Sequence, residues 1–430
     1  MLREELIFVA TCDISGQVRG KAFPAQELPS RLRKGVGWTP TNLMISALGP
    51  IWDTPFGTAG DLMLVPDPWT EARVDFGDGS APEHFYLGDL RTLDGTPWDC
   101  CPREFLRRAV ASLARQGYGL IAAFEQEFVY TGIDEVPGAP YSLSAFRRQG
   151  VFGEMLTAAM RAAGVTPDSF LPEYGARQFE VTAAPAPPLR AADHAVITRE
   201  MVRAAAFRLG HRVIFAPMLD PAGTGNGVHI HMSLRDAANK PATYAADEPY
   251  GLSAAARHFF AGVLTHLPGL CAITAPSPVS YLRLTPNRWA PTRADIAIRD
   301  RGASLRVCPV FAAADAAETA RQYNVEFRPA DAAASPYMAL GAIIFAGTDG
   351  LARGLELPPG PSSNAPDLAG VKALPKSLDE ALDALEGTSA AREWLGSMLF
   401  DAYLRAKRAE AANTRDWDPA ILCARYADAY

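Results

Sequence analysis

The chain has 430 residues, of which 48% are hydrophobic, and this length is enough for a large core and two domains. Its formal net charge is −7, and the absence of any run of five or more Lys or Arg argues against a nucleic-acid or membrane-surface partner. No apolar stretch is long enough to span a bilayer, so we expect a cytoplasmic protein that acts on small molecules.

The N-terminal part of the sequence is rich in short strand and turn patterns. Apolar runs at 6–13 and 17–24, separated by a short Gly-containing turn, predict a β-hairpin. Between 35 and 100, Gly, Pro, Asp and Trp cluster as they do in turns between short strands. We therefore expect an N-terminal domain over 1–98 and a second domain over 99–430.

Amphipathic patterns predict helices in the second domain. The first covers 102–117, with Asp99 as its N-cap and Gly117 at its end. Further helical patterns lie at 144–163, 189–209, 252–268, 335–352 and 377–411. The segment 359–367 is expected to be a short loop, and the six cysteines, which lack CxxC spacing, are expected to be free thiols.

The run FEQEFVY at 124–130 places two acids on one face of a predicted strand. Side chains at i and i+2 of an extended chain share a face, so Glu125 and Glu127 project together from apolar surroundings. Like charges there repel unless a cation lies beside them, and carboxylate oxygens suit Mg²⁺ or Mn²⁺. The alternative is a solvated edge strand, which explains this run equally well when it is taken alone.

Three further motifs add ligand-type side chains to apolar strands. His229 and His231 share a strand face in GNGVHIHMSL, Glu173 and Glu180 flank the turn of PEYGARQFEV, and Glu326 lies in VEFRPAD. An exposed ion or ion pair explains any one of these motifs better than a site does. Together, acids and histidines without zinc-type thiolate spacing predict a site for oxygen-preferring cations.

Arginines accompany these motifs in a chain that is acidic overall. Arg283 lies in YLRLTP, Arg328 follows the VEF strand, and Arg299, Arg301 and Arg306 lie in AIRDRGASLRV. Guanidinium groups bind carboxylate and phosphate through two-point contacts, although a solvated basic strand is the alternative. Beside a carboxylate-bound metal they indicate phosphoryl transfer. Because no GxxxxGK[ST] loop is present, metal, arginine and backbone groups would have to hold the nucleotide.

Taken in order along the chain, these motifs resemble the glutamine synthetase family. The series begins with RGK (19–21), DLMLVPD (61–67) and LDGTPWD (93–99), and it ends with EFRPAD…SPYMALGAIIFAGTDG (326–350). Between them lie EQE, EYGARQFE, GNGVHIHMSL, RLTP…AP and DRGASLR. Each motif is weak by itself, but the ordered set covers nearly the whole chain and is specific.

The resemblance implies an α+β fold: an N-terminal β-grasp domain followed by a glutamine synthetase-type catalytic domain, which is a curved antiparallel sheet with flanking helices. It implies an ATP-dependent ligase with about two or three Mg²⁺ or Mn²⁺ ions per active site. It also implies a homo-oligomer, expected to be a dodecamer of two stacked hexameric rings with active sites at subunit interfaces.

The resemblance further implies roles for individual residues. The ligands of the first metal, on the amino-acid side of the site, would be Glu127, Glu173 and Glu180. The ligands of the second metal, beside the ATP phosphates, would be Glu125, His229 and Glu326. Nucleotide contacts would come from His231, Ser233, Arg301 and Arg306. Substrate contacts would come from Gly225, His229, Arg283, Arg328 and Trp289, and catalytic groups would be Arg301, Glu326 and Arg328.

Two departures from the family pattern concern the nitrogen substrate. Members that use ammonia bind it through an aspartate in a DGSS-like loop and a glutamate in a GYEAP-like flap. Here these segments read GWTPTNLM (37–44) and PNRWAP (286–291), with Trp289 in place of the flap acid. An indole does not compensate the charge of NH₄⁺, but it packs against a carbon skeleton or offers a cation–π face. An organic amine is therefore favoured, and an acid from elsewhere in the protein is the alternative.

Three functions follow from these observations. The first is a γ-glutamyl ligase that joins glutamate to an organic amine through γ-glutamyl phosphate. The second is a glutamine synthetase that uses ammonia, and the third is a non-catalytic structural or regulatory relative. All six implied metal-ligand positions are Glu or His, which disfavours the third. The segment FAPML (215–219) lacks a lysine that the family has, and Thr224 stands where the family often has asparagine near the glutamate, so a glutamate analogue is an alternative acid substrate.

Overall fold

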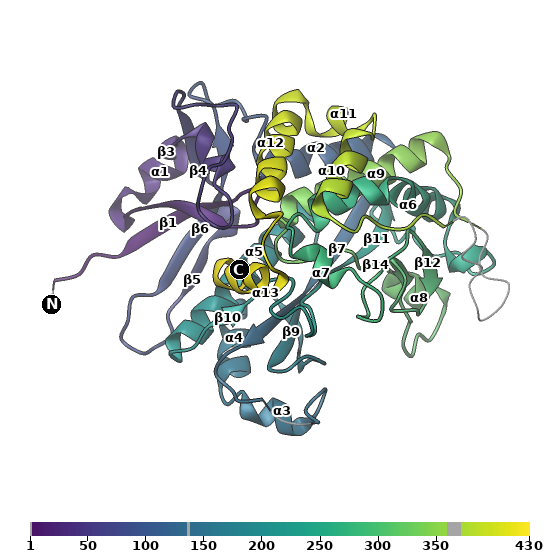
Figure 1. Ribbon diagram of the computed structural model, residues 1–430, viewed down its shortest axis with the longest axis horizontal. Helices are drawn as coiled ribbons and strands as arrows, with labels where there is room; N and C mark the ends of the chain where they lie inside the picture. The colour runs from purple at the N-terminus through teal and green to yellow at the C-terminus, as the bar shows by residue number, and fades with distance from the viewer. Residues whose placement is uncertain (1, 136–137, 359–370) are drawn as a thin grey trace.

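The computed structural model describes residues 2–135, 138–358 and 371–430 and shows an α+β architecture built on two sheets (Figure 1). The strands of the first sheet come from the N-terminal part of the chain, drawn in purple and blue. The larger sheet and most of the helices come from the remainder. The loop predicted at 359–367 lies outside the described residues.

The N-terminal sheet has the strand order β2–β1–β6–β4–β3, and β5 also pairs with β6. The predicted hairpin is confirmed, because β1 and β2 pair in antiparallel register. β1 and β6 are parallel, so the sheet is mixed. The strands are β1 (Leu6–Cys12), β2 (Val18–Pro24), β3 (Val36–Trp38), β4 (Leu62–Pro66), β5 (Ala72–Val74) and β6 (Glu83–Arg91). The helical segments here are α1 (Leu28–Lys34) and the 3₁₀ turns η1 (Ala25–Glu27), η2 (Pro40–Met44) and η3 (Pro68–Thr70).

The larger sheet has the strand order β12–β13–β14–β11–β7–β9–β8, and β10 pairs with one end of β7. Its pairs are antiparallel, as predicted, except that β12 and β13 are parallel. The strands are β7 (Tyr118–Tyr130), β8 (Pro167–Pro172), β9 (Gln178–Ala183), β10 (Val213–Ile214), β11 (Val228–Asp236), β12 (Ile296–Ile298), β13 (Leu305–Val307) and β14 (Val325–Phe327).

The central strand β7 separates a buried core face from the site face of the sheet. Phe124, Gln126 and Phe128 alternate along β7 and are buried, and the Gln126 side chain bonds to Arg199 of α5 beneath the sheet. The intervening acids therefore point to the opposite face, because side chains alternate along a strand.

Helices surround the larger sheet. They are α2 (Pro102–Arg115), α3 (Leu143–Arg148), α4 (Phe152–Ala162), α5 (Pro188–Arg208), α6 (Ala254–Thr274), α7 (Ser280–Arg283), α8 (Ala316–Gln322), α9 (Pro336–Arg353), α10 (Leu378–Glu386), α11 (Ala391–Leu395), α12 (Ser397–Thr414) and α13 (Pro419–Ala429), with a 3₁₀ turn η4 (Pro249–Gly251). Helices α6 and α9 cross at Gly262 and Gly350, where an added Cβ on either residue would collide with the other helix.

Several predicted helix boundaries are wrong. Asp99 does not cap the first helix: α2 begins at Pro102, whose ring fixes φ for a first helical turn, and Cys101 is its N-cap. The segment 144–163 is two helices, because Gly150 adopts a φ of +63° between them.

The two remaining differences concern helix length. Helix α6 continues through Pro268, beyond the predicted end at 268, to Thr274. The segment 377–411 is three helices, α10 to α12, which are interrupted near Gly387 and Gly396.

A buried ion network joins the two sheets. Arg103 of α2 is fully buried, and it donates hydrogen bonds to Asp193 of α5 at 3.0 Å and to Asp89 of β6 at 2.6 Å. It also donates to Asp67, which follows β4, at 2.9 Å. A buried guanidinium is stable only with such partners, so these contacts fix the N-terminal sheet against the remainder of the chain.

The six cysteines are all free and buried, as predicted. Among residues 2–135, 138–358 and 371–430, no helix combines the length and the apolar character needed to cross a membrane.

Candidate active site

Pairing of the central strands brings the predicted metal ligands together. β7 lies between β11 and β9, so that Glu125 is the register partner of His229 and Glu127 is the partner of Glu180. On the other side of β11, His231 is the partner of Glu326 in β14. The sequence motifs that carry these residues are therefore neighbours on one face of the sheet.

Glu125 binds both histidines of β11. Its Oε2 lies 3.1 Å from His229 Nδ1, and its Oε1 lies 2.8 Å from His231 Nε2. Although burial opposes ionisation of Glu125, the two adjacent imidazoles hold the pKa of that carboxyl well below its usual range. Burial likewise opposes protonation of His231, but Glu125 raises the pKa of this imidazole well above its usual value. The histidines predicted to share a strand face do so.

Three acids line a cavity of about 510 Å³ beside this cluster. They are Glu127, Glu173 and Glu180. Burial, together with the charges of Glu125 and Glu127, raises the pKa of Glu180 well above its usual range. Burial and Glu127 raise the pKa of Glu173 in the same direction. The backbone N–H of Gly227 donates to Glu127 at 2.6 Å, which holds that carboxylate at the cavity floor.

This donor set fits a divalent cation. Glu125, Glu180 and His229 each offer one ligand atom, and these atoms lie within 4.8 Å of one another. Burial and the charges of the neighbouring carboxylates both raise the pKa of Glu180, and a bound cation would offset both effects. Carboxylate oxygens with one imidazole nitrogen are ligands that Mg²⁺ and Mn²⁺ accept.

Glu326 lies fully buried on β14 between two arginines. Arg306, its register partner on β13, donates to one carboxylate oxygen, and Arg328 Nη1 donates to the other at 2.5 Å. Burial opposes its charge, but His229 and Arg328 lower the pKa of Glu326 below its usual value. The predicted acid and base of VEFRPAD therefore form an ion pair.

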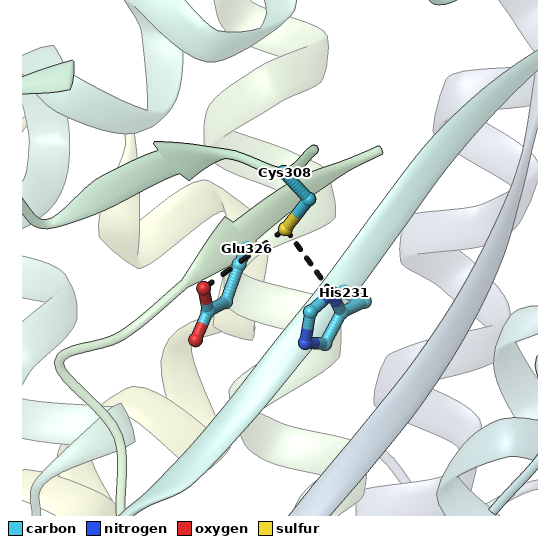
Figure 2. A group of neighbouring side chains, drawn as sticks. All are labelled: His231, Cys308 and Glu326. Carbon is cyan, nitrogen blue, oxygen red and sulfur yellow. Dashed lines mark hydrogen bonds between the residues drawn. The ribbon is translucent and has the colours of Figure 1, made fainter. Parts of the chain in front are cut away.

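A cysteine that the sequence reasoning did not select lies beside this pair. The Sγ of Cys308, which follows β13, is 3.6 Å from His231 Nδ1 and 4.0 Å from Glu326 Oε2 (Figure 2). Asn324 Oδ1 lies 2.8 Å from the same imidazole nitrogen. No spacing motif marked either residue, because β13 and β14 bring them to His231 only in the folded sheet.

The opposite wall of the cavity carries the residues predicted to hold the amino-acid substrate. Arg283 lies on α7, is buried, and donates to the carbonyl of Ala330 at 3.1 Å. A Cβ at Gly225 would lie 2.8 Å from the Arg283 side chain and 2.7 Å from the Pro217 carbonyl, so only glycine fits there. Gln178, which the sequence analysis passed over within EYGARQFE, donates to the Gly225 carbonyl at 2.9 Å.

The segment 286–291, the flap, covers one side of the cavity. Trp289 has a φ of +52°, is 61% exposed, and its ring centroid lies 5.4 Å from that of Tyr174. Arg328 Nη2 donates to the Trp289 carbonyl at 3.1 Å, and Arg288 donates to the carbonyls of Pro221 and Gly223. Three hydrogen bonds therefore hold the flap against the cavity.

The two other predicted nucleotide contacts lie in different places. Ser233 follows His229 and His231 on β11 and donates to the Tyr323 carbonyl at 2.9 Å. Arg301 is exposed and lines the same cavity as Glu127, Glu173 and Trp289. Tyr141, also missed from the sequence, donates from its hydroxyl to Glu173 at 3.0 Å, and burial with that acid raises the pKa of Tyr141 to about 12.

Known proteins share this arrangement along the whole chain. Residues 2–98 match the family model of the glutamine synthetase N-terminal domain, and residues 99–420 match that of the glutamine synthetase catalytic domain. The chain belongs to the glutamine synthetase family. It is therefore an ATP-dependent carbon–nitrogen ligase of a family that uses ATP and divalent metals and is typically oligomeric.

Relatives within the glutamine synthetase family cover nearly all of this chain. It is 36% identical to gamma-glutamylpolyamine synthetase GlnA3 of Streptomyces coelicolor, over 98% of this chain and 92% of the relative. It is 29% identical to glutamine synthetase of Thermococcus kodakarensis, over 92% of this chain and 86% of the relative.

Solved structures in the family have the same fold. The crystal structure of a novel glutamine synthase homolog matches with a TM-score of 0.93 and 41% identity, over 100% of this chain and 99% of that one. A complex of the protein GmaS with ADP matches with a TM-score of 0.83 and 25% identity, over 96% and 95% of the two chains. The α+β architecture is therefore that of the family.

Proposed function

We propose that this chain is a γ-glutamyl ligase that joins glutamate, or a close analogue, to an organic amine. The observation that carries the proposal is Trp289, which stands at the cavity where ammonia-using members have a glutamate. Its indole lies against Tyr174, and both rings line the cavity that contains Glu173. Such a wall favours an alkyl or aryl ammonium group through packing and cation–π contact. The likeness to a relative named gamma-glutamylpolyamine synthetase supports an amine substrate.

The reaction begins with activation of the acid. Arg283 and Gly225 hold the amino-acid end of glutamate, and Arg328 faces its γ-carboxylate. An oxygen of that carboxylate attacks the terminal phosphorus of ATP, the bond to the ADP oxygen breaks, and γ-glutamyl phosphate forms. Arg301, Arg306 and Arg328 neutralise the charge that spreads over the transferring phosphoryl group.

Two sets of ligands in this chain would hold divalent ions, roughly two or three per site as in other carboxylate-bound phosphoryl-transfer centres. When bound, the ions neutralise and orient the phosphate oxygens. The first set is Glu127, Glu173 and Glu180. The second set is Glu125, His229 and Glu326. Glu125 also fixes the His231 ring, which faces the nucleotide side with Ser233.

The amide forms in the second step. The amine nitrogen attacks the acyl carbon, the bond to phosphate breaks, and the amine proton is lost as inorganic phosphate leaves. Water would hydrolyse the acyl phosphate, so the flap must exclude it. The hydrogen bonds from Arg288 to the Gly223 carbonyl and from Arg328 to the Trp289 carbonyl hold the flap in place, which supports this role.

We also propose that the chain divides into domains 1–98 and 99–430 and assembles as a dodecamer of two stacked hexameric rings, with each site completed by a neighbour. The matched family segments, 2–98 and 99–420, support this division. Analytical ultracentrifugation tests the assembly, since a stable monomer would contradict it.

One assay separates the three candidate functions. Phosphate release from ATP, glutamate and Mg²⁺ is measured with ammonium, monoamines, ethanolamine, polyamines and aromatic amines. The proposal expects amine-dependent phosphate release, with one amine preferred over ammonium and the amide confirmed by mass spectrometry. Equal use of ammonium identifies a glutamine synthetase, and no turnover with any nitrogen donor identifies a non-catalytic relative.

A further inference from the structure

The Cys308 thiol lies beside His231 and Glu326, two residues of the proposed site, and has no role of its own in the reaction proposed above. Its Sγ is buried, and its nearest polar neighbours are a carbonyl at 3.7 Å, His231 Nδ1 at 3.6 Å and Glu326 Oε2 at 4.0 Å. Figure 2 shows the three side chains converging from β11, β14 and the end of β13. One sulfur, one nitrogen and one oxygen donor therefore lie within 4.8 Å of one another.

The separations between these atoms suit a tetrahedral ion. With metal–sulfur and metal–nitrogen bonds of about 2.3 and 2.0 Å, a tetrahedral Zn²⁺ holds its sulfur and nitrogen ligands about 3.5 Å apart. Sγ and Nδ1 already lie at 3.6 Å. The sulfur and oxygen ligands of such an ion are about 3.6 Å apart, so the Glu326 oxygen, at 4.0 Å, needs only a small shift.

The His231 ring is oriented to serve as a ligand. Glu125 Oε1 lies 2.8 Å from Nε2, so once Nδ1 has lost its proton the imidazole keeps donating Nε2–H to this carboxylate and has a free lone pair at Nδ1, the nitrogen that lies 3.6 Å from Sγ. A carboxylate behind the imidazole is the usual partner of a zinc-bound histidine. Asn324 Oδ1, 2.8 Å from Nδ1, would give up that contact or become a fourth ligand.

The charges also balance. A thiolate and the Glu326 carboxylate with a neutral imidazole compensate a divalent ion, and as the metal binds both the thiol proton and the Nδ1 proton of the His231 imidazolium pass to solvent. Arg306 would release Glu326 to make room for the ion. Thiolate is a soft ligand that favours Zn²⁺ strongly over Mg²⁺.

We propose that Cys308, His231 and Glu326 form an inhibitory site for a thiophilic divalent cation of the zinc type. When the cation binds there, Glu326 no longer belongs to the proposed Mg²⁺ ligand set of Glu125, His229 and Glu326. His231 then binds the cation and no longer contacts the nucleotide. Zinc binding and productive Mg²⁺–ATP binding are therefore mutually exclusive, so zinc at low concentration stops the ligase.

The test uses Co²⁺ as a spectroscopic substitute for Zn²⁺ in the full-length protein. A near-ultraviolet sulfur-to-cobalt charge-transfer band is expected, and it should disappear on addition of Zn²⁺. Cys308→Ser should lack the band, whereas the control Cys423→Ser, at another buried cysteine, should keep it. A band of full intensity in Cys308→Ser, or no band in the wild-type protein, overturns the proposal. This readout needs no turnover, so it is independent of the proposed function.

Inhibition gives a second readout. The Zn²⁺ concentration for half-inhibition should rise at least about tenfold in Cys308→Ser and Cys308→Ala. Replacing a residue that only hydrogen-bonds to a zinc ligand already weakens zinc binding about tenfold, and these variants remove the ligand itself. Excess Mg²⁺–ATP should protect the wild-type enzyme. Equal zinc sensitivity of the wild type and both variants contradicts the inhibitory role.

Discussion

Glu127 of β7 and Glu180 of β9 are direct cross-strand partners, so two carboxylates face each other at the floor of one cavity. Like charges opposite each other in a sheet are destabilising. Glu180 is affected by this repulsion. Burial and the neighbouring acids together raise the pKa of Glu180 well above its usual range. The acids therefore weaken the fold unless protons or cations neutralise them, which links metal binding to pH.

The first prediction concerns Glu180→Gln. The folded state holds the Glu180 proton more tightly than the unfolded state, so metal-free protein loses stability as pH rises through the raised pKa. The variant should lose this part of the pH dependence and melt at a higher temperature than the wild type at pH 8 without metal. Adding Mg²⁺ should raise the melting temperature of the wild type more at pH 8 than at pH 6, and much less in the variant.

Activity provides the complementary measurement. Glu180→Gln should lower kcat/KM by about 100-fold or more. Replacing a residue that only hydrogen-bonds to a metal ligand already lowers activity by up to about 100-fold, and Glu180 is proposed to bind the metal directly. The matched control is Glu154→Gln on α4, an acid outside the cavity lining. If Glu180→Gln melts lower than the wild type at pH 8 in chelator, the repulsion account is wrong.

Much of the site could be predicted because it lies on strands. Alternation along an extended chain makes Glu125 and Glu127, and likewise His229 and His231, share a face without knowledge of the partner strands. Apolar neighbours excluded a solvated strand once several such motifs were combined. The hairpin at the N-terminus followed from equally local signals.

The rest depends on contacts that only the folded chain creates. Cys308 and Asn324 meet His231 through the pairing of β11, β13 and β14, and no local spacing signals that pairing. The helix at 144–163 was predicted too long because its apolar period continues across Gly150, whose left-handed φ ends the first helix. The cap at Asp99 was wrong because Pro102 fixes the start of α2 three residues later.

The second prediction concerns Trp289→Ala. If the indole binds the organic part of the amine, its removal should raise KM for the preferred amine roughly two- to thirty-fold, the range of about 0.5–2 kcal/mol for cation–π contacts. KM for glutamate should stay unchanged. Trp69→Ala is the control, because Trp69 is an exposed tryptophan that follows β4 in the N-terminal part of the chain and does not line this cavity. An unchanged amine KM in Trp289→Ala would argue against an indole contact with the amine.

The third prediction tests the flap contacts. Arg288→Met removes the hydrogen bonds to the Pro221 and Gly223 carbonyls, which should let water reach the acyl phosphate. The ratio of amide formed to ADP released should fall in Arg288→Met and recover partly in Arg288→Lys. Arg293→Met, an exposed arginine that does not line the cavity, should retain the wild-type ratio. A wild-type ratio in Arg288→Met would show that these contacts do not control water entry.

The fourth prediction concerns how α13 joins distant parts of the fold. The buried Tyr430 hydroxyl donates to the Ser15 carbonyl at 2.8 Å, and the Tyr430 carbonyl accepts from the Phe215 N–H at 2.9 Å. Tyr430→Phe leaves the Ser15 carbonyl without this donor, which should lower the free energy of unfolding by about 1 kcal/mol in urea titrations. Tyr174→Phe, at a residue that is 55% exposed, should change it by less than about 0.5 kcal/mol. If Tyr430→Phe has the same free energy of unfolding as the wild type, the hydrogen bond between Tyr430 and the N-terminal hairpin turn contributes nothing measurable to stability.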